Sequence, residues 1–214
     1  MDSIKTAIES GDLAELDRLL TLNPNLANKK IQWESNTEVK SDPLHYISDC
    51  IFYKLLTNDT EAQLAKTLIK YGALINGSED SETPLIGAAS LGAASVAKVL
   101  IDAGADIHAT SVHGSTALHW SCYMGLSEIA EALIHHGAEI EKRCSSFEST
   151  PLFWAVHSIH TDKDKDPAGR LASAKVLIEN GANKRTENHE GYSVFQLAKD
   201  SGNLEIIKLL EPDN

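Results

Sequence analysis

Long apolar runs, cysteines and aromatic residues are all scarce in this sequence. No stretch of the 214 residues approaches the ~18 apolar residues that cross a membrane, and the N-terminus lacks the basic start and apolar run of a secretion signal. The three cysteines are odd in number and show no Cys-x-x-Cys spacing, which indicates reduced thiols in a cytoplasmic protein rather than a disulfide framework. Aromatic residues are only 6%, which favours small, closely packed helices.

Positive charge is also in deficit. The chain has 19 Lys and Arg residues against 31 Asp and Glu residues, so its formal net charge is −12. Such a chain repels a phosphate backbone, and no basic stretch offsets the repulsion. We therefore expect neither nucleic acid nor a membrane surface as a partner. A protein with a basic and apolar patch is favoured.

Signatures of catalysis are missing as well. The sequence contains no G-x-S-x-G, no H-E-x-x-H, no phosphate-binding P-loop and no G-x-G-x-x-G after a strand. Among nine histidines, only His157 and His160 combine with Asp162 and Asp164 at a ligand-like spacing, and no cysteine joins them. We therefore expect no catalytic residues, no cofactor and no metal site.

Internal repetition is what the sequence does have. A short motif recurs as DPLHYI (42–47), TPLIGA (83–88), TALHWS (116–121), TPLFWA (150–155) and SVFQLA (193–198). A second motif follows it, and its glycines, Gly72, Gly104, Gly137 and Gly181, stand 32, 33 and 44 residues apart. Two independent markers thus share a period near 33, which predicts a stack of similar units.

Each unit is predicted to contain two helices. Between the two motifs, Ala97, Leu100 and Ile101 are spaced i, i+3, i+4 and share one helix face, and the equivalent positions repeat this pattern. Thr83, Thr116 and Thr150 suit the N-cap of the first helix, with proline next in two of the three cases. The recurrent glycine suits a left-handed C-cap of the second helix.

This order of T-P-L-H-x-A, a second helix and G-A-D-I-N resembles the ankyrin repeat. The resemblance implies an all-α solenoid of stacked helix-turn-helix units with β-turn fingers, forming a single domain over residues 1–214. Six repeats are expected, near 3–28, 40–76, 81–108, 114–141, 148–183 and 191–211. It also implies that His45 and His119, the motif histidines, make structural hydrogen bonds between neighbouring fingers.

Three segments depart from the repeat. The insert at 51–59 is apolar enough to extend the first helix of repeat two, whereas the insert at 160–168 is polar and is predicted to form a solvated loop before a turn at Gly169. The finger at 29–41 is long and contains Trp33. These segments either drifted into exposed loops or shape a binding face, and Trp33 either anchors a partner or folds back on the first repeats.

The resemblance implies that fingers and first helices line a concave partner-binding surface. The acidic and apolar residues at these positions predict that this surface is centred on repeats three to five. The candidate partner-binding residues are Glu79, Asp80, Glu82, Val112, His113, Tyr123, Met124, Phe147, His157 and Trp33. Apolar side chains at positions that should face solvent are typical of a recognition patch. Trp120 and Trp154 either pack between the first helices or join this surface.

The expected function is a non-catalytic, monomeric protein-interaction module that acts as an adaptor or inhibitor. One alternative is a neutraliser of a cognate toxin or effector. Another is a structural protein that binds a small ligand or a metal between the finger tips and the inserts.

Overall fold

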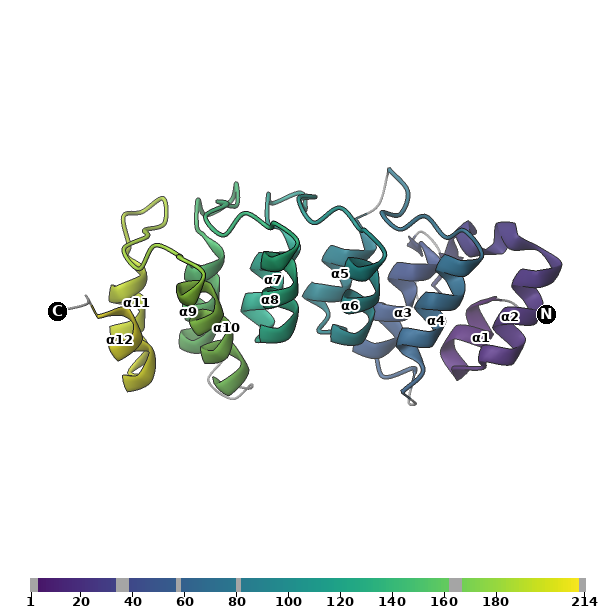
Figure 1. Ribbon diagram of the computed structural model, residues 1–214, viewed down its shortest axis with the longest axis horizontal. Helices are drawn as coiled ribbons and strands as arrows, with labels where there is room; N and C mark the ends of the chain where they lie inside the picture. Colours follow the sequence, from purple (N-terminus) through teal and green to yellow (C-terminus); the bar gives the residue numbers. More distant parts are fainter. Residues whose placement is uncertain (1–3, 34–38, 57–58, 80–81, 162–166, 212–214) are drawn as a thin grey trace. The chain divides into compact units, whose positions relative to one another are not determined.

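The computed structural model describes residues 4–33, 39–56, 59–79, 82–161 and 167–211. The chain divides into two compact units, residues 1–106 and 107–214. Each unit consists almost wholly of short helices joined by turns, with fingers that project from one edge of the helices (Figure 1). The predicted all-α class is confirmed.

The first unit stacks three helix pairs: α1 (Ile4–Ser10) with α2 (Leu13–Leu22), α3 (Pro43–Phe52) with α4 (Glu61–Lys70), and α5 (Pro84–Ser90) with α6 (Ala94–Asp102). The first helix of each pair packs on the next first helix, so α1, α3 and α5 form one row. The second helices α2, α4 and α6 form the other row. We call these the inner and the outer row.

The second unit repeats this arrangement. Its pairs are α7 (Ala117–Met124) with α8 (Ser127–His135), α9 (Pro151–Thr161) with α10 (Pro167–Glu179), and α11 (Val194–Ser201) with α12 (Leu204–Leu210). Helices α7, α9 and α11 form the inner row, and α8, α10 and α12 form the outer row. Every predicted repeat interval thus contains one helix pair.

The core lies between the two rows of each unit. On α6, the predicted face of Ala97, Leu100 and Ile101 is buried. On α8, Ala130 and Leu133 are fully buried, whereas Ile134 is half-buried. The i and i+3 positions are therefore the constant core contacts, because they point between the rows, while the i+4 position lies at the margin.

The predicted caps are in place. Thr83 Oγ1 accepts a hydrogen bond from the backbone N–H of Ile86 (3.4 Å), and Thr150 Oγ1 does the same for Phe153 (3.4 Å). Gly104, after α6, has a φ of +84°, which is the left-handed conformation that glycine adopts without strain. The recurrent threonine and glycine are thus explained by the backbone groups at the helix ends.

A side-chain link recurs between neighbouring pairs. The Oδ1 of Asn28, at the end of the 3₁₀ helix η1 (Pro24–Asn28), accepts from the backbone N–H of Leu74 (2.7 Å). Asn76 Oδ1 accepts from the N–H of Asp106 (2.8 Å), and Glu141 Oε1 accepts from the N–H of Asn183 (2.8 Å). These acceptors occupy the same place relative to their helix pairs, which indicates that the first pair follows the same register as the later ones.

The long first finger is a two-stranded ribbon. Strand β1 (Ile31–Gln32) pairs antiparallel with β2 (Lys40–Ser41), with Ile31 opposite Ser41. Ile31 is buried, so the ribbon is attached to the first unit through one face. Part of the finger, residues 34–38, lies outside the described residues.

The apolar insert at 51–59 extends the inner helix by less than predicted. Helix α3 has 10 residues against 7 in α5, but it ends at Phe52. The chain then reverses through Lys54, whose φ is +56°, and the N–H groups of Leu55 and Leu56 both donate to Cys50 O. Leu56 is buried, so the chain turns back after Phe52 instead of continuing as a helix into solvent.

The polar insert contradicts two details of the prediction. Helix α9 continues through His160 to Thr161, and α10 begins at Pro167, so Gly169 lies inside a helix rather than at the turn. Pro167 suits the first helical turn because no backbone N–H is needed there. The start of α10 also packs tightly on α7: a Cβ on Gly125 would lie 2.9 Å from the N atom of Arg170. Residues 162–166 lie outside the described part of the chain.

The contact between α3 and α5 depends on the absence of a side chain at Gly87. A Cβ on Gly87 would lie 2.7 Å from Cε1 of His45, so Gly87→Ala should lower the free energy of unfolding by about 1–3 kcal/mol. Denaturant unfolding measures this loss, and combining the change with His45→Ala should recover part of it.

Gly104→Ala is the control for this double-mutant cycle of Gly87→Ala and His45→Ala. Its Cβ would meet nothing within 4 Å, so only the positive φ opposes alanine, at about 1 kcal/mol. His45→Ala should leave that cost unchanged, and additive effects of Gly87→Ala and His45→Ala would contradict the proposed contact.

Candidate partner-binding groove

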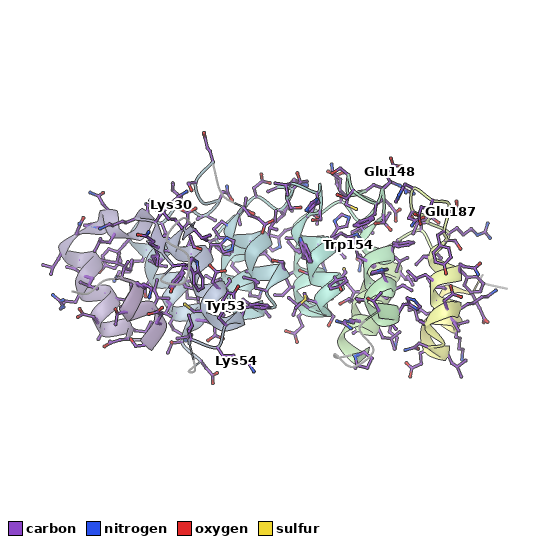
Figure 2. The ribbon with its side chains drawn as sticks, turned by 180° about the vertical axis from the view of Figure 1, so that it is seen from behind. Lys30, Tyr53, Lys54, Glu148, Trp154 and Glu187 are labelled. Carbon is purple, nitrogen blue, oxygen red and sulfur yellow. The ribbon has the colours of Figure 1, made fainter. Side chains whose placement is uncertain are left out.

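The second unit contains a groove between its inner helices and its fingers. The cavity has a volume of about 770 Å³. We call it the aromatic groove, and it is lined by Trp120, Tyr123, Ser146, Phe147, Ser149, Phe153, Trp154, His157, His160, Thr161, Asn188, His189, Glu190, Tyr192 and Leu197. Figure 2 shows Trp154 on the helices below the two fingers that carry Glu148 and Glu187. The size suffices for several side chains of a partner.

Three rings form the centre of the groove. The Trp120 and Trp154 ring centroids lie 5.0 Å apart at 87°, and Tyr123 lies 6.0 Å from each of them at 75–80°. His157 stacks on Tyr123 at 6.5 Å, so the cluster continues along α9. Edge-to-face contacts of this kind hold the rings in fixed orientations. The groove therefore has a rigid aromatic wall.

The two tryptophan N–H groups differ in their hydrogen bonding. Trp154 Nε1 donates to Ser149 Oγ at 3.0 Å, and that hydroxyl is also 3.4 Å from Cys144 Sγ. Trp120 Nε1 is buried and has no acceptor among the described residues. Trp154 is thus positioned by the finger in front of its own helix, whereas the Trp120 ring contacts Trp154 and Tyr123.

The fingers beside the groove are joined to one another. His113 O accepts from the N–H of Ser145 (2.9 Å), and Phe147 O accepts from the N–H of His189 (3.1 Å). Arg143 reinforces the second link by donating to the backbone oxygens of Glu148 and Glu187. The rim of the groove is therefore an ordered ladder of hydrogen bonds.

A buried arginine ties the groove to the helix that follows the polar insert. Arg170, in the first turns of α10, is only 2% exposed. Its Nε donates to Tyr123 O (3.2 Å) and its Nη1 donates to Ser158 O (3.0 Å), so one guanidinium bridges the C-terminal parts of α7 and α9. Carbonyl oxygens at helix C-termini favour a cation. No sequence motif marks Arg170, and its role became visible only through this contact.

His119 connects neighbouring fingers, as the resemblance implied. Its Nδ1 accepts from the N–H of Thr116 (3.1 Å), so its Nε2 carries the proton and donates to Ser149 O (3.2 Å). Burial lowers the pKa of His119 to about 4. The ring is therefore neutral at pH 7. The Nε2 atom of His45 lies 3.7 Å from Oδ1 of Asp49, on its own helix.

The predicted partner-binding residues are only partly brought together. Tyr123, Phe147 and His157 line the aromatic groove. Val112, which is 94% exposed, lies on a finger outside it, and half-buried Met124 ends α7 without lining it. The His113 Nδ1 lies 3.2 Å from Ser146 Oγ, so this side chain links two fingers.

The acidic finger belongs to the other unit. Glu79 and Glu82 are exposed there, and Asp80 lies outside the described residues. Trp33 also lies in the first unit, where its ring packs edge-on against Tyr46 (5.1 Å) and Tyr53 (5.2 Å) and its Nε1 donates to Ser41 Oγ (3.2 Å). Of the two readings of Trp33, this placement supports the one in which it folds back.

The aromatic groove also contains residues that the predicted set lacked. Trp120 and Trp154 pack against each other from α7 and α9, and both line the cavity. Phe153, from α9, was missed because its apolar side chain at a helix start is indistinguishable in sequence from a core residue.

Among the described residues, no group of three or more His, Cys, Asp or Glu side chains gathers to hold a metal ion. His157 and His160 line the groove, but Asp162 and Asp164 lie outside the described residues. None of the described helices combines the length and the apolar character needed to cross a membrane.

Comparison with protein families identifies the repeat. The family model described as "Ankyrin repeats (3 copies)" matches residues 58–144. This segment includes helices α4 to α8 and contains three ankyrin repeats. The fold class expected from the sequence, a stack of ankyrin-type helix pairs, is thereby confirmed.

Several curated proteins share part of the sequence. Palmitoyltransferase ZDHHC13 of Mus musculus is 27% identical over 133 residues, which are 62% of this chain and 20% of that protein. The human protein of the same name is 25% identical over 120 residues, 56% of this chain and 18% of that protein. Ankyrin repeat and SAM domain-containing protein 6 of Rattus norvegicus is 30% identical over 144 residues, 61% and 15% of the two chains. This chain spans about a fifth or less of the length of these relatives.

The burial of His119 predicts a pH dependence of stability. Its pKa is about 4 in the folded chain against 6.5 unfolded, so the unfolded state takes up the proton first as the pH falls. This contribution to stability is complete above pH 6.5 and is lost progressively between pH 6.5 and 4, to a total of about 3 kcal/mol. Denaturant unfolding of the wild type and of His119→Gln across this range measures it, and parallel pH profiles would contradict it.

The two groove tryptophans should respond differently to the same change. Trp154→Phe removes the donor to the buried Ser149 hydroxyl, whereas Trp120→Phe removes an N–H that has no acceptor among the described residues. Unfolding free energies should therefore show Trp154→Phe to be the more destabilising, by about 1 kcal/mol. Equal losses would mean that the Trp154 bond contributes nothing.

Proposed function

We propose that this chain is a non-catalytic protein-interaction module that binds a segment of a partner protein in the aromatic groove. The observation that carries the proposal is a rigid, half-buried wall of aromatic rings in an open cavity of about 770 Å³. Large aromatic rings that remain partly exposed to water usually mark a recognition surface, because their burial in a complex stabilises that complex. The ankyrin repeats at 58–144 support this function, since such repeats serve as interaction scaffolds.

The groove also has the composition of a binding hot spot. Tryptophan and tyrosine are enriched among the residues that dominate binding energy, and such residues cluster at the centre of an interface. Trp120, Tyr123 and Trp154 form one such cluster, with Phe147 on the finger above it and exposed by 55%. We propose an adaptor or inhibitor role on this basis. The transferase activity in the names of two relatives is not carried over, because this chain matches only a fifth of their length.

We further propose that the repeats continue on both sides of residues 58–144, to six in all. The support is the recurring link from Asn28, Asn76 and Glu141 to a backbone N–H of the next helix pair. If the first pair did not follow the register of the later pairs, Asn28 would not be expected at the position equivalent to Asn76 and Glu141. Single-domain behaviour over residues 1–214 follows from the same proposal.

Capture of partner proteins from an extract of the source cells tests the proposed function. Tyr123→Ala and Phe147→Ala should each reduce the captured partner by about tenfold or more, as expected of hot-spot residues. Val112→Ala is the matched control, because Val112 is an exposed apolar finger residue outside the groove.

A triple change of Glu79, Asp80 and Glu82 in the same assay tests the acidic finger separately. Undiminished capture by both groove variants would refute the placement of the binding site. A bound metabolite in native mass spectrometry, without any captured protein, would favour the small-ligand alternative.

A further inference from the structure

The aromatic groove is lined mainly by uncharged side chains. Glu190 is the one residue with a permanent charge in its described lining, which contains no lysine and no arginine. The pKa of His157, in the wall, is lowered, first by partial burial and then by the neighbouring His160, which disfavours its charged form. The chain as a whole carries a formal charge of −12. An apolar hollow with these surroundings attracts cations and repels anions.

The rings that form the wall have the chemistry to hold a cation. The face of an aromatic ring is negative, and tryptophan attracts a cation most strongly. Trp120, Tyr123 and Trp154 are each half-buried and each line the cavity, so each keeps part of its surface toward it. Their near-perpendicular packing directs ring surfaces of different orientation into one space.

The second unit already pairs cations with aromatic rings. The guanidinium carbon of Arg170 lies 5.9 Å from the centroid of the Tyr123 ring, although Arg170 is not part of the groove lining. On α11, Lys199 Nζ lies 4.5 Å over the ring of Phe195. Both contacts show that the rings of this unit tolerate a positive charge at close range.

We propose that the aromatic groove receives an arginine side chain that projects from an extended segment of the partner protein. The inference rests on the proposed function and names the chemistry of that same site. The planar guanidinium stacks on Trp154 or Tyr123 and is balanced by Glu190, while the aliphatic stem and flanking apolar residues contact Phe147, Phe153 and Leu197. Arginine is favoured over lysine because guanidinium is planar and more weakly hydrated than ammonium.

Selection from a displayed library of random heptapeptides on the immobilised full chain tests the inference. Peptides enriched on the wild type should carry an arginine next to apolar residues, and enrichment should disappear on Trp154→Ala. Trp154→Phe keeps a ring and should retain a weaker selection, which guards against loss of folding in the alanine variant. Circular dichroism verifies the helix content of both variants.

Synthetic peptides then isolate the charge. Replacing the arginine of a selected peptide by citrulline, which has nearly the same shape but no charge, should weaken binding by about tenfold. Glu190→Gln should weaken the arginine peptide by about threefold and leave the citrulline peptide unchanged. Glu131→Gln, an exposed carboxylate on the outer helix α8, is the matched control and should change neither.

The outcomes separate this inference from the proposed function. Peptides that need Trp154 but carry no arginine, or equal binding of the arginine and citrulline peptides, would overturn the inference and leave the groove as a protein-binding site. Peptides that bind Trp154→Ala as well as the wild type would overturn both. A library without any arginine-containing binder would also overturn the inference. The capture experiment would then show whether the groove binds a partner protein.

Discussion

The structure depends on the burial of apolar side chains between successive helix pairs. A single pair such as α5 and α6 has too little surface to enclose a core, and Ala97 and Leu100 become fully buried because the neighbouring pair supplies part of their surroundings. The inner and outer rows of each unit follow from this requirement. Finger contacts, caps and side-chain links then fix the spacing between pairs, so that the register found at one junction recurs at the next.

One position of the inner helices shows how function is added to such a stack. The residue after the motif histidine position is Tyr46 in the second pair, Gly87 in the third, Trp120 in the fourth and Trp154 in the fifth. Gly87 leaves room for the His45 ring, and Tyr46 is fully buried and donates to Glu9. The Trp120 and Trp154 rings are only half-buried, so part of each ring lies in the groove. The aromatic groove thus arises where large rings occupy this position in two successive pairs of the second unit.

The inserts act on the same rows. The apolar insert adds about one turn to α3 and ends in a chain reversal, where Phe52 and Tyr53 are more than half exposed. Figure 2 shows Lys54, in this reversal, far from Lys30 of the long finger. The polar insert is followed by the longer helix α10, whose early residue Arg170 bridges α7 and α9. The guanidinium carbon of Arg170 also lies 5.9 Å from the centroid of the Tyr123 ring, so the helix that follows the insert supports one of the rings in the groove wall.

The sequence by itself determined the period, the helix pairs, their caps and the all-α class, because these follow from local spacing of apolar residues, threonine and glycine. It also singled out Tyr123, Phe147 and His157 as candidates. Only the tertiary structure decided which candidates meet. It placed Val112 and Met124 outside the groove, folded Trp33 onto Tyr46 and Tyr53, and put Gly169 inside α10. The physical reason is that a repeat pattern assigns a side chain to a face, whereas the space beside it depends on the side chains of the next pair.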